Sequence, residues 1–207
     1  MAATTDTGTG HPLAVLVARF KRDLAGHVDT PLWSLDADDT AALLVDLAEV
    51  IASLAELEAR AVTQAEALDL PGSIGARSVS AWLRRLVPIT PGQAHRTTRF
   101  AHELATHDQT RVAAAEGRVL PDQAAVIVAA VDELDPVHRD LAEKHLIAEA
   151  AHHDAKALKL LGRRILEVID PARADAHEAR LLEAEEAQAR KKTRFSLHDD
   201  DQGMTHG

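Results

Sequence analysis

The chain has 207 residues, a formal net charge of −10 at neutral pH and no cysteine, and 46% of its residues are hydrophobic although only 2% are aromatic. This composition provides enough apolar residues for a core and excludes a globally disordered chain, while the lack of cysteine excludes a disulfide framework and a thiolate metal site. No apolar run approaches the ~20 residues that a membrane-spanning helix needs. We expect a cytoplasmic, all-α protein with no membrane contact and a core of Ala, Leu, Val and Ile side chains.

Two helices are predicted near the N-terminus, after a leader over residues 1–10 that is expected to be disordered. The first helix covers 12–28, and the second, much longer helix begins at Asp36 and ends at Pro71-Gly72. Its length, roughly 50 Å at 1.5 Å per residue, exceeds what a compact domain needs. We therefore expect it to pair with another long helix, in a bundle or a homo-oligomer. The apolar stripe of this helix has nearly heptad spacing and consists of Leu43, Leu47, Val50, Leu54, Leu57, Ala61 and Leu68.

Capping signals divide the middle of the chain into shorter helices. Ser78 is expected to cap a short helix that precedes a Val-Pro-Ile break. Thr90, Pro91 and Gln93 then have the pattern of a capping box, with Thr as N-cap, Pro at the first helical position and Gln at the third. Together these signals predict two consecutive helices with a short connection between them.

Further helices are predicted as far as residue 190. A short helix ends at Gly117, and the later helices are expected over 121–134, 135–151, 154–170 and 171–190. Arg194–Leu197 alternates in the manner of a strand, and a turn follows it. We therefore assign a helical domain to 11–192 and an incomplete β hairpin to 193–207.

A short motif recurs after 30 residues. Pro91-Gly92-Gln93-Ala94 and the later Glu103-Leu104 match Pro121-Asp122-Gln123-Ala124 and Glu133-Leu134. In both places a short helix, a break and a Pro-started helix are predicted in the same order, which indicates a duplicated helix–turn–helix-like unit. The alternative is that the shared letters are simply a good helix start. The first copy is basic, and the second contains acidic residues and an apolar run.

The first copy lies within a stretch from Leu70 to His102 that has no acidic residue. Basic charge on two short helices is a common way to contact a phosphate backbone, so nucleic-acid contact is the leading interpretation. The candidate residues are Arg77, Arg84, Arg85, Gln93, His95, Arg96 and Arg99. In this interpretation the second helix of the pair enters a groove of DNA.

A different interpretation of the same arginines stays open. They could form a solvated basic face, or they could pair with acidic residues of the long helix at Asp46, Glu49 and Glu56. Trp82 could stack on a base, but it shares a helical face with Leu86, so we expect it to anchor its helix in the core.

No catalytic, metal or cofactor site is predicted. The 12 histidines contain no pair three or four residues apart on a helix, which is the spacing of an H-x-x-x-H zinc site. His145 and Glu149 have the nearest usable spacing. The sequence has no nucleophile elbow, no phosphate-binding loop and no G-x-G-x-x-G.

Several segments resemble one family. The Ser78-x-x-x-Trp82-Leu83 helix, the Pro91-x-Gln93-Ala94 start, the segment from Glu116 to Ala124 and the Asp201-Gln202-Gly203-Met204 turn are similar to the actinobacterial domain of unknown function 222, over about residues 40–207. This domain occurs in "thirteen-E-twelve repeat" proteins, where it usually precedes an HNH endonuclease domain. The resemblance implies a DNA-directed role and supplies no catalytic residues. The absence of asparagine and cysteine argues against an HNH site in this sequence, so we expect a non-enzymatic chain that is truncated before the nuclease domain.

Two classes of function follow from these observations. The first is a DNA-binding or accessory domain that contacts phosphates through the basic helix pair. The second is a protein–protein interaction module in which the long helices form the interface and the basic patch contacts an acidic partner. The salt dependence of DNA binding separates the two, because phosphate contacts give a steep dependence.

Overall fold

The computed structural model describes residues 10–192, 198–199 and 205–206, with backbone alone at several positions of the last helix and in the two short C-terminal strands. The described chain forms two compact units, residues 1–45 and residues 46–207. The division into a leader, a helical domain and a hairpin that the sequence suggests stays a prediction. Among the described residues, no helix has both the length and the apolar character required to cross a bilayer.

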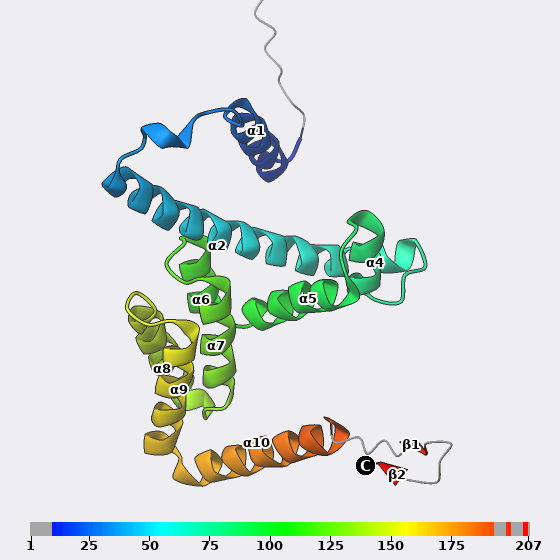
Figure 1. The fold of residues 1–207 in the computed structure, drawn as a ribbon, viewed down its shortest axis with the longest axis vertical. Coiled ribbons are helices and arrows are strands. Elements are labelled where there is room, and N and C mark those ends of the chain that lie inside the picture. Colours follow the sequence, from blue (N-terminus) through cyan, green and yellow to red (C-terminus); the bar gives the residue numbers. More distant parts are fainter. Residues whose placement is uncertain (1–9, 193–197, 200–204, 207) are drawn as a thin grey trace, which may run out of the picture. The chain divides into compact units, whose positions relative to one another are not determined.

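The first unit contains α1 (Pro12–Gly26), a 3₁₀ turn η1 (Leu32–Ser34) and the beginning of α2 (Ala37–Ala67), which continues into the second unit. Figure 1 shows the order of the elements. Both predicted N-terminal helices are present, and α2 ends before Pro71-Gly72, which lies in a single helical turn. The elements after α2 are α3 (Leu70–Ser73), α4 (Val79–Leu86), α5 (Pro91–Ala105), α6 (Asp108–Ala115), α7 (Pro121–Asp132), α8 (Pro136–Glu149), α9 (Ala155–Ile169), α10 (Pro171–Lys192), β1 (His198–Asp199) and β2 (Thr205–His206).

The predicted N-cap residues lie at the starts of α4, α5 and α9 in the second unit. The side chain of Ser78 accepts the Ala81 N–H at 3.2 Å, and Thr90 accepts the Gln93 N–H at the same distance. Asp154 accepts the Ala157 N–H at 2.8 Å. Each cap satisfies a backbone donor that has no partner within its own helix, so these polar residues determine where the helices start.

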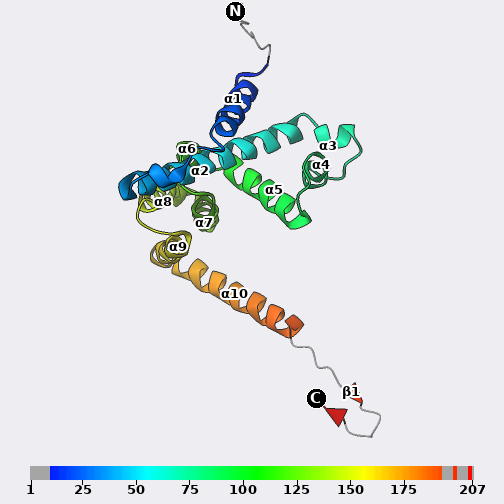
Figure 2. The ribbon, with the colours of Figure 1, turned by 45° about the horizontal axis from the view of Figure 1, so that its top comes forward.

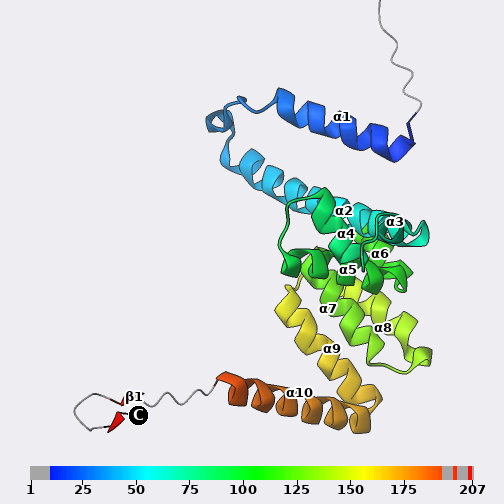
Figure 3. The ribbon, with the colours of Figure 1, turned by 90° about the vertical axis from the view of Figure 1, so that its right-hand side faces the viewer.

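The core of the second unit is built around α7. Ala124, Ile127, Val128 and Val131 are at most 1% exposed, and α5, α6, α8 and α9 all contact this helix. Figures 1 and 3 show α7, α8 and α9 side by side. Alanines account for 10 of the 22 buried hydrophobic residues that the structure describes. Such small side chains let the helix backbones approach closely, which compensates for the scarcity of aromatic residues.

α2 packs on the rest of the second unit through its small residues. Ala52 and Ala59 are buried, whereas Leu47 and Leu54, of the predicted apolar stripe, are exposed. The stripe therefore has the predicted spacing but lies on the face opposite the core. Hydrophobic spacing identifies a seam, but it does not identify the surface that the seam contacts.

Gly162 lies where α9 packs closely against α7. A Cβ atom at Gly162 would lie 2.6 Å from the Cβ atom of Ala130, well inside van der Waals contact. We expect Gly162→Ala to lower the free energy of unfolding, because overpacking costs about 1–3 kcal/mol, although alanine gains about 1 kcal/mol of helix propensity over glycine. Urea denaturation would measure the change.

Gly92→Ala is the matched control for Gly162→Ala. Gly92 is also helical, in the first turn of α5, and the nearest atom to its added Cβ would be an Arg96 guanidinium nitrogen at 3.6 Å. This variant should be as stable as the wild type or more stable. A gain of stability in Gly162→Ala would contradict the close packing of α7 and α9.

The two C-terminal strands are short. β1 and β2 pair antiparallel, with His198 opposite His206 and Asp199 opposite Thr205. The predicted strand Arg194–Leu197 lies outside the described residues. Two residue pairs do not establish the incomplete β hairpin expected over 193–207, so the described chain is all-helical apart from this pairing and the hairpin stays a prediction.

Candidate nucleic-acid interface

The basic segment folds into the α4–α5 pair. The two helices contact each other, and the connection between them runs from Val87 to Thr90 (Figure 2). The hydroxyl groups of Ser80 and Thr98 hydrogen-bond across the pair at 2.8 Å. Trp82 is half-buried against the core, as its helical position predicts. The pair is also held to α2, because His102 contacts Glu66 at 2.7 Å.

All of the predicted contact residues are exposed. Arg77 precedes α4, and Arg84 and Arg85 lie in its last turn. Arg85 donates to the carbonyl oxygen of Ile74 at 2.9 Å, which fastens the end of α4 to the preceding loop. This arginine therefore has a structural role whether or not it contacts DNA.

The outer face of α5 brings three of the candidates together. Arg99 lies three residues after Arg96 and four residues after His95, so it shares a helix surface with both of them, away from the buried residues Ala94 and Thr98. Arg99 also contacts Glu103, at 3.4 Å on the same helix. We call His95, Arg96 and Arg99 the α5 basic face.

Gln93 lies at the beginning of α5, next to the α5 basic face. It is exposed, and its backbone N–H donates to the Thr90 side chain. Arg77, Arg84 and Arg96 make no hydrogen bond or ion pair with any other residue that the structure describes. Their guanidinium groups are exposed to solvent.

The pairing of these arginines with the acidic side chains of α2 is not found in the described part of the chain. Glu56 is buried at 1% exposure and instead pairs with Arg60 at 2.8 Å and with Arg111 at 3.5 Å. Arg111 lies on α6, so the buried carboxylate of α2 forms an ion pair with an arginine of the second helix pair rather than of the first. One alternative explanation for the basic segment is thereby removed.

The sequence repeat corresponds to a structural one. α4 and α6 both have eight residues, and α5 and α7 both begin at a proline. Four pairs of buried residues correspond at the 30-residue offset, namely Ala94 and Ala124, Thr98 and Val128, Ala101 and Val131, and Leu104 and Leu134. The two helix pairs thus use the same positions to face the core.

The outer faces of the two copies differ. The α5 basic face corresponds to Ala125, Val126 and Ala129 of α7, which line a groove of about 320 Å³ whose opposite wall is α9. In the second copy a helix of the chain lies beside this face, while in the first copy the equivalent face is exposed and basic. This helix face therefore packs beside another helix in the second copy and is exposed to solvent in the first.

A second basic run, on α9, was not predicted from the sequence. Lys156, Lys159, Arg163 and Arg164 lie within one helix that has a single acidic residue, Glu167. The charge count that identified the first segment would also have found this one. Its Lys159 and Arg163 lie at the α7–α9 groove, so part of this charge belongs to the packing of the second copy.

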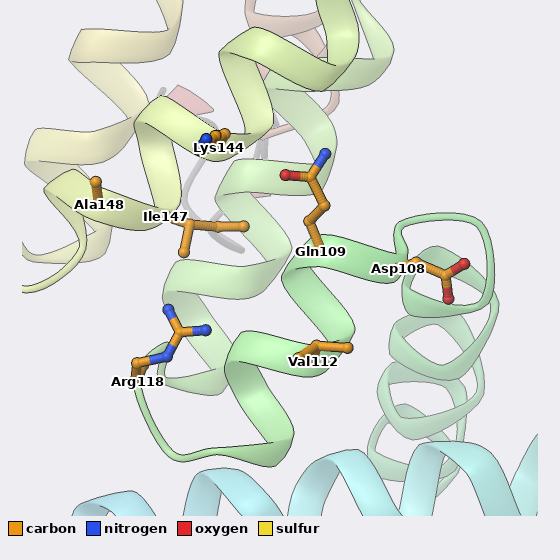
Figure 4. A pocket seen from close by; sticks show the side chains of 7 residues that line it. All are labelled: Asp108, Gln109, Val112, Arg118, Lys144, Ile147 and Ala148. Atoms are coloured by element: carbon orange, nitrogen blue, oxygen red, sulfur yellow. The ribbon is translucent and has the colours of Figure 1, made fainter.

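A further groove lies between α6 and α8. It has a volume of about 550 Å³, and Val112 and Ile147 contribute apolar surface to it (Figure 4). Its Arg118 is paired with Glu116 at 2.6 Å, and Asp108 is paired with Arg111 at 3.1 Å. These charged groups are held by local ion pairs, so the groove does not assemble an acid–base constellation.

Within the described residues, no three His, Cys, Asp or Glu side chains come together as a metal site. Glu149 contacts His153 at 3.3 Å, not the His145 with which it has the nearest usable spacing in the sequence. The described histidines therefore take part in pairwise contacts with carboxylates or lie on the surface.

A comparison with family models finds one match, described as "Domain of unknown function (DUF222)", over residues 41–207. Comparisons with curated proteins and with solved structures find no significant match. The matched range contains the α4–α5 pair, its α6–α7 copy and the helices that pack on them. Because the match covers most of the chain, and because the resembling segments include the helix starts and the α6–α7 turn described above, this protein belongs to the DUF222 family.

Proposed function

We propose that the α4–α5 pair is a DNA-binding surface and that the protein is a DNA-binding or accessory domain without catalysis of its own. The observation that carries the proposal is the α5 basic face, which stays open where the second copy packs against a helix. Arg84 and Arg77 add positive charge beside it, and no acidic residue lies between Leu70 and His102. Phosphate contacts supply most of the affinity of such surfaces for DNA.

The arrangement of two short helices suits a helix–turn–helix mode of contact. In that mode the second helix lies in the major groove and its N-terminal residues meet base edges. α5 would be this helix, with Gln93 and His95 near its start and Arg96 and Arg99 toward the backbone. The similarity to domains that precede HNH nucleases agrees with a DNA partner, and the protein would then position rather than cut DNA.

Titration of a fluorescent duplex with the protein at several salt concentrations tests the proposal. We expect affinity to fall as salt rises, with a slope of about −2 to −4 in log K against log salt for two to four phosphate contacts. In the Arg84→Gln/Arg96→Gln variant the steepness of that slope should fall by about 2, roughly one unit for each arginine that no longer neutralises a phosphate. These two arginines are chosen because neither has a partner among the described residues.

Lys156→Gln/Arg164→Gln is the matched control for this variant. It removes the same charge from exposed positions on α9, so it separates a local contact from a general effect of net charge. We expect its salt slope to equal that of the wild type. Equal changes of slope in the two variants, or a wild type with no affinity for DNA at low salt, would refute a DNA-binding role for α4–α5.

A further inference from the structure

The distribution of apolar residues on α2 is inverted. The side that packs within residues 46–207 carries small residues such as Ala52 and Ala59, at 1% and 3% exposure. The opposite side carries Leu47, Val50 and Leu54, at 44%, 38% and 39% exposure. A surface helix ordinarily turns its larger apolar side chains toward the core. A contiguous row of large apolar side chains on the outside instead marks an interaction surface.

The spacing of this row is that of a coiled-coil seam. Leu47, Val50, Leu54 and Leu57 recur at intervals of three and four residues, and Ala61 continues the series. We call these five residues the outer seam. Beside it, Ile51 is 59% exposed, which widens the apolar surface.

The residues that border the outer seam indicate which surface packs against it. Asp46, Ser53 and Arg60 each precede a seam residue, and they are seven residues apart, so they lie along the same border. When two copies of α2 run antiparallel with Val50 of one beside Leu54 of the other, Asp46 of each copy lies beside Arg60 of the other. Ser53 then meets Ser53, near a two-fold axis.

A parallel pairing lacks this complementarity. It would bring the Asp46 border beside Ile51, and Arg60 beside Ala65, so that no opposite charges would meet. Arg60 is available for the antiparallel contact, since its side chain is 46% exposed although its Nε contacts Glu56. An arginine has five N–H donors, enough for both carboxylates.

We infer that α2 is a dimerisation helix, whose outer seam packs antiparallel against the outer seam of a second copy of this chain. Such an interface is isologous, with the same patch used by both copies, which is the commonest arrangement of homodimers. The inference does not depend on the proposed function. A dimer would carry two copies of the α4–α5 surface, and linked surfaces bind an extended ligand more tightly than single ones.

Sedimentation equilibrium of the whole chain tests the dimer. The wild type should dimerise reversibly, and Leu54→Glu should raise the dissociation constant by about 100-fold or more, since each change enters the two-fold seam twice. Leu141→Glu is the control, because Leu141 is 75% exposed on α8 and lies off the seam. It should leave the dissociation constant unchanged. Circular dichroism and urea denaturation of both variants show whether they stay folded.

Cross-linking tests the register, because the sequence contains no cysteine. With a short bismaleimide, Ser53→Cys should give cross-linked dimers. Asp46→Cys should not, because the two Asp46 positions would lie about 21 Å apart at 1.5 Å per residue. Ser73→Cys, exposed and outside α2, measures random collision.

Three results would overturn the inference. One is a wild type that sediments as a monomer at every concentration. If Leu54→Glu also destabilises that monomer, another part of the chain covers the seam. Another is a Leu54→Glu variant that dimerises as well as the wild type. The third is Asp46→Cys cross-linking as efficiently as Ser53→Cys, which would indicate a parallel or unspecific pairing.

Discussion

Replacing Gly117 by alanine is expected to lower the free energy of unfolding by about 3 kcal/mol or more, from a strained backbone and a steric clash together. Gly117 ends α6 with φ at +76°, a left-handed conformation that costs other residues about 1–2 kcal/mol. An added Cβ would also lie 2.7 Å from the Glu49 Cβ atom and 3.0 Å from its Cα atom. The second contact involves the backbone of α2, which cannot move aside as a flexible side chain can.

Gly75→Ala separates the two causes. Gly75 also has a positive φ, +66°, but no atom lies within 4 Å of the position of its added Cβ. The free energy of unfolding of Gly75→Ala should therefore fall only by the cost of the left-handed backbone conformation, about 1–2 kcal/mol. Chemical denaturation of both variants gives the comparison, and equal losses of stability would show that α2 does not approach the α6–α7 turn as closely as described. The close contact with Glu49 of α2 thus explains why the Glu116–Ala124 segment has a glycine at position 117.

Replacing Glu143 by alanine is expected to cost about 3 kcal/mol, because it removes the acceptor of two buried donors. Glu143 lies on α8 at 5% exposure, and its Oε1 accepts the backbone N–H of Thr110 at 2.8 Å and the Thr110 hydroxyl at 2.7 Å. Thr110 is the third residue of α6 and is fully buried. His107, the N-cap of α6, makes no capping bond with its own side chain, so a carboxylate from another helix takes that part.

Glu143→Gln keeps an oxygen acceptor at the same place and should lower the stability by about 1 kcal/mol, the difference between a charged and a neutral acceptor. A double-mutant cycle of Glu143→Ala with Thr110→Val then isolates the hydroxyl contact. A coupling energy of about 1 kcal/mol is expected, while additive changes in stability would show that the two side chains do not interact. Thermal unfolding monitored by circular dichroism supplies all four stabilities.

The helices were predictable from local chemistry. A short polar side chain in front of an apolar run predicts a helix start, because it can accept a hydrogen bond from a free backbone N–H. Ser78, Thr90 and Asp154 are such residues. The α5 and α7 starts were further marked by proline. Exposure of the basic side chains of α4 and α5 also follows from the sequence, because arginine is seldom buried without a partner.

The partners of the long-range contacts were not predictable. Nothing in the local pattern indicates that Glu56 pairs with Arg111, or that Glu143 caps α6, because these contacts join residues far apart in the chain. The orientation of α2 was ambiguous for a similar reason. Its alanine face and its leucine face have equally regular spacing, and only the packing of the other helices decides which of them is inside.

The alanine-lined core reverses the usual logic of core mutagenesis. Buried positions such as Ala94, Ala113 and Ala124 are already alanine. A conventional alanine scan therefore gives no information on nearly half of the buried hydrophobic residues that the structure describes. The informative direction is enlargement, because an added methyl group must separate two helix backbones. Tolerance of larger residues at these positions would then map where the helices can move apart, and sequence variation in this core is expected to run toward glycine and serine rather than toward valine or leucine.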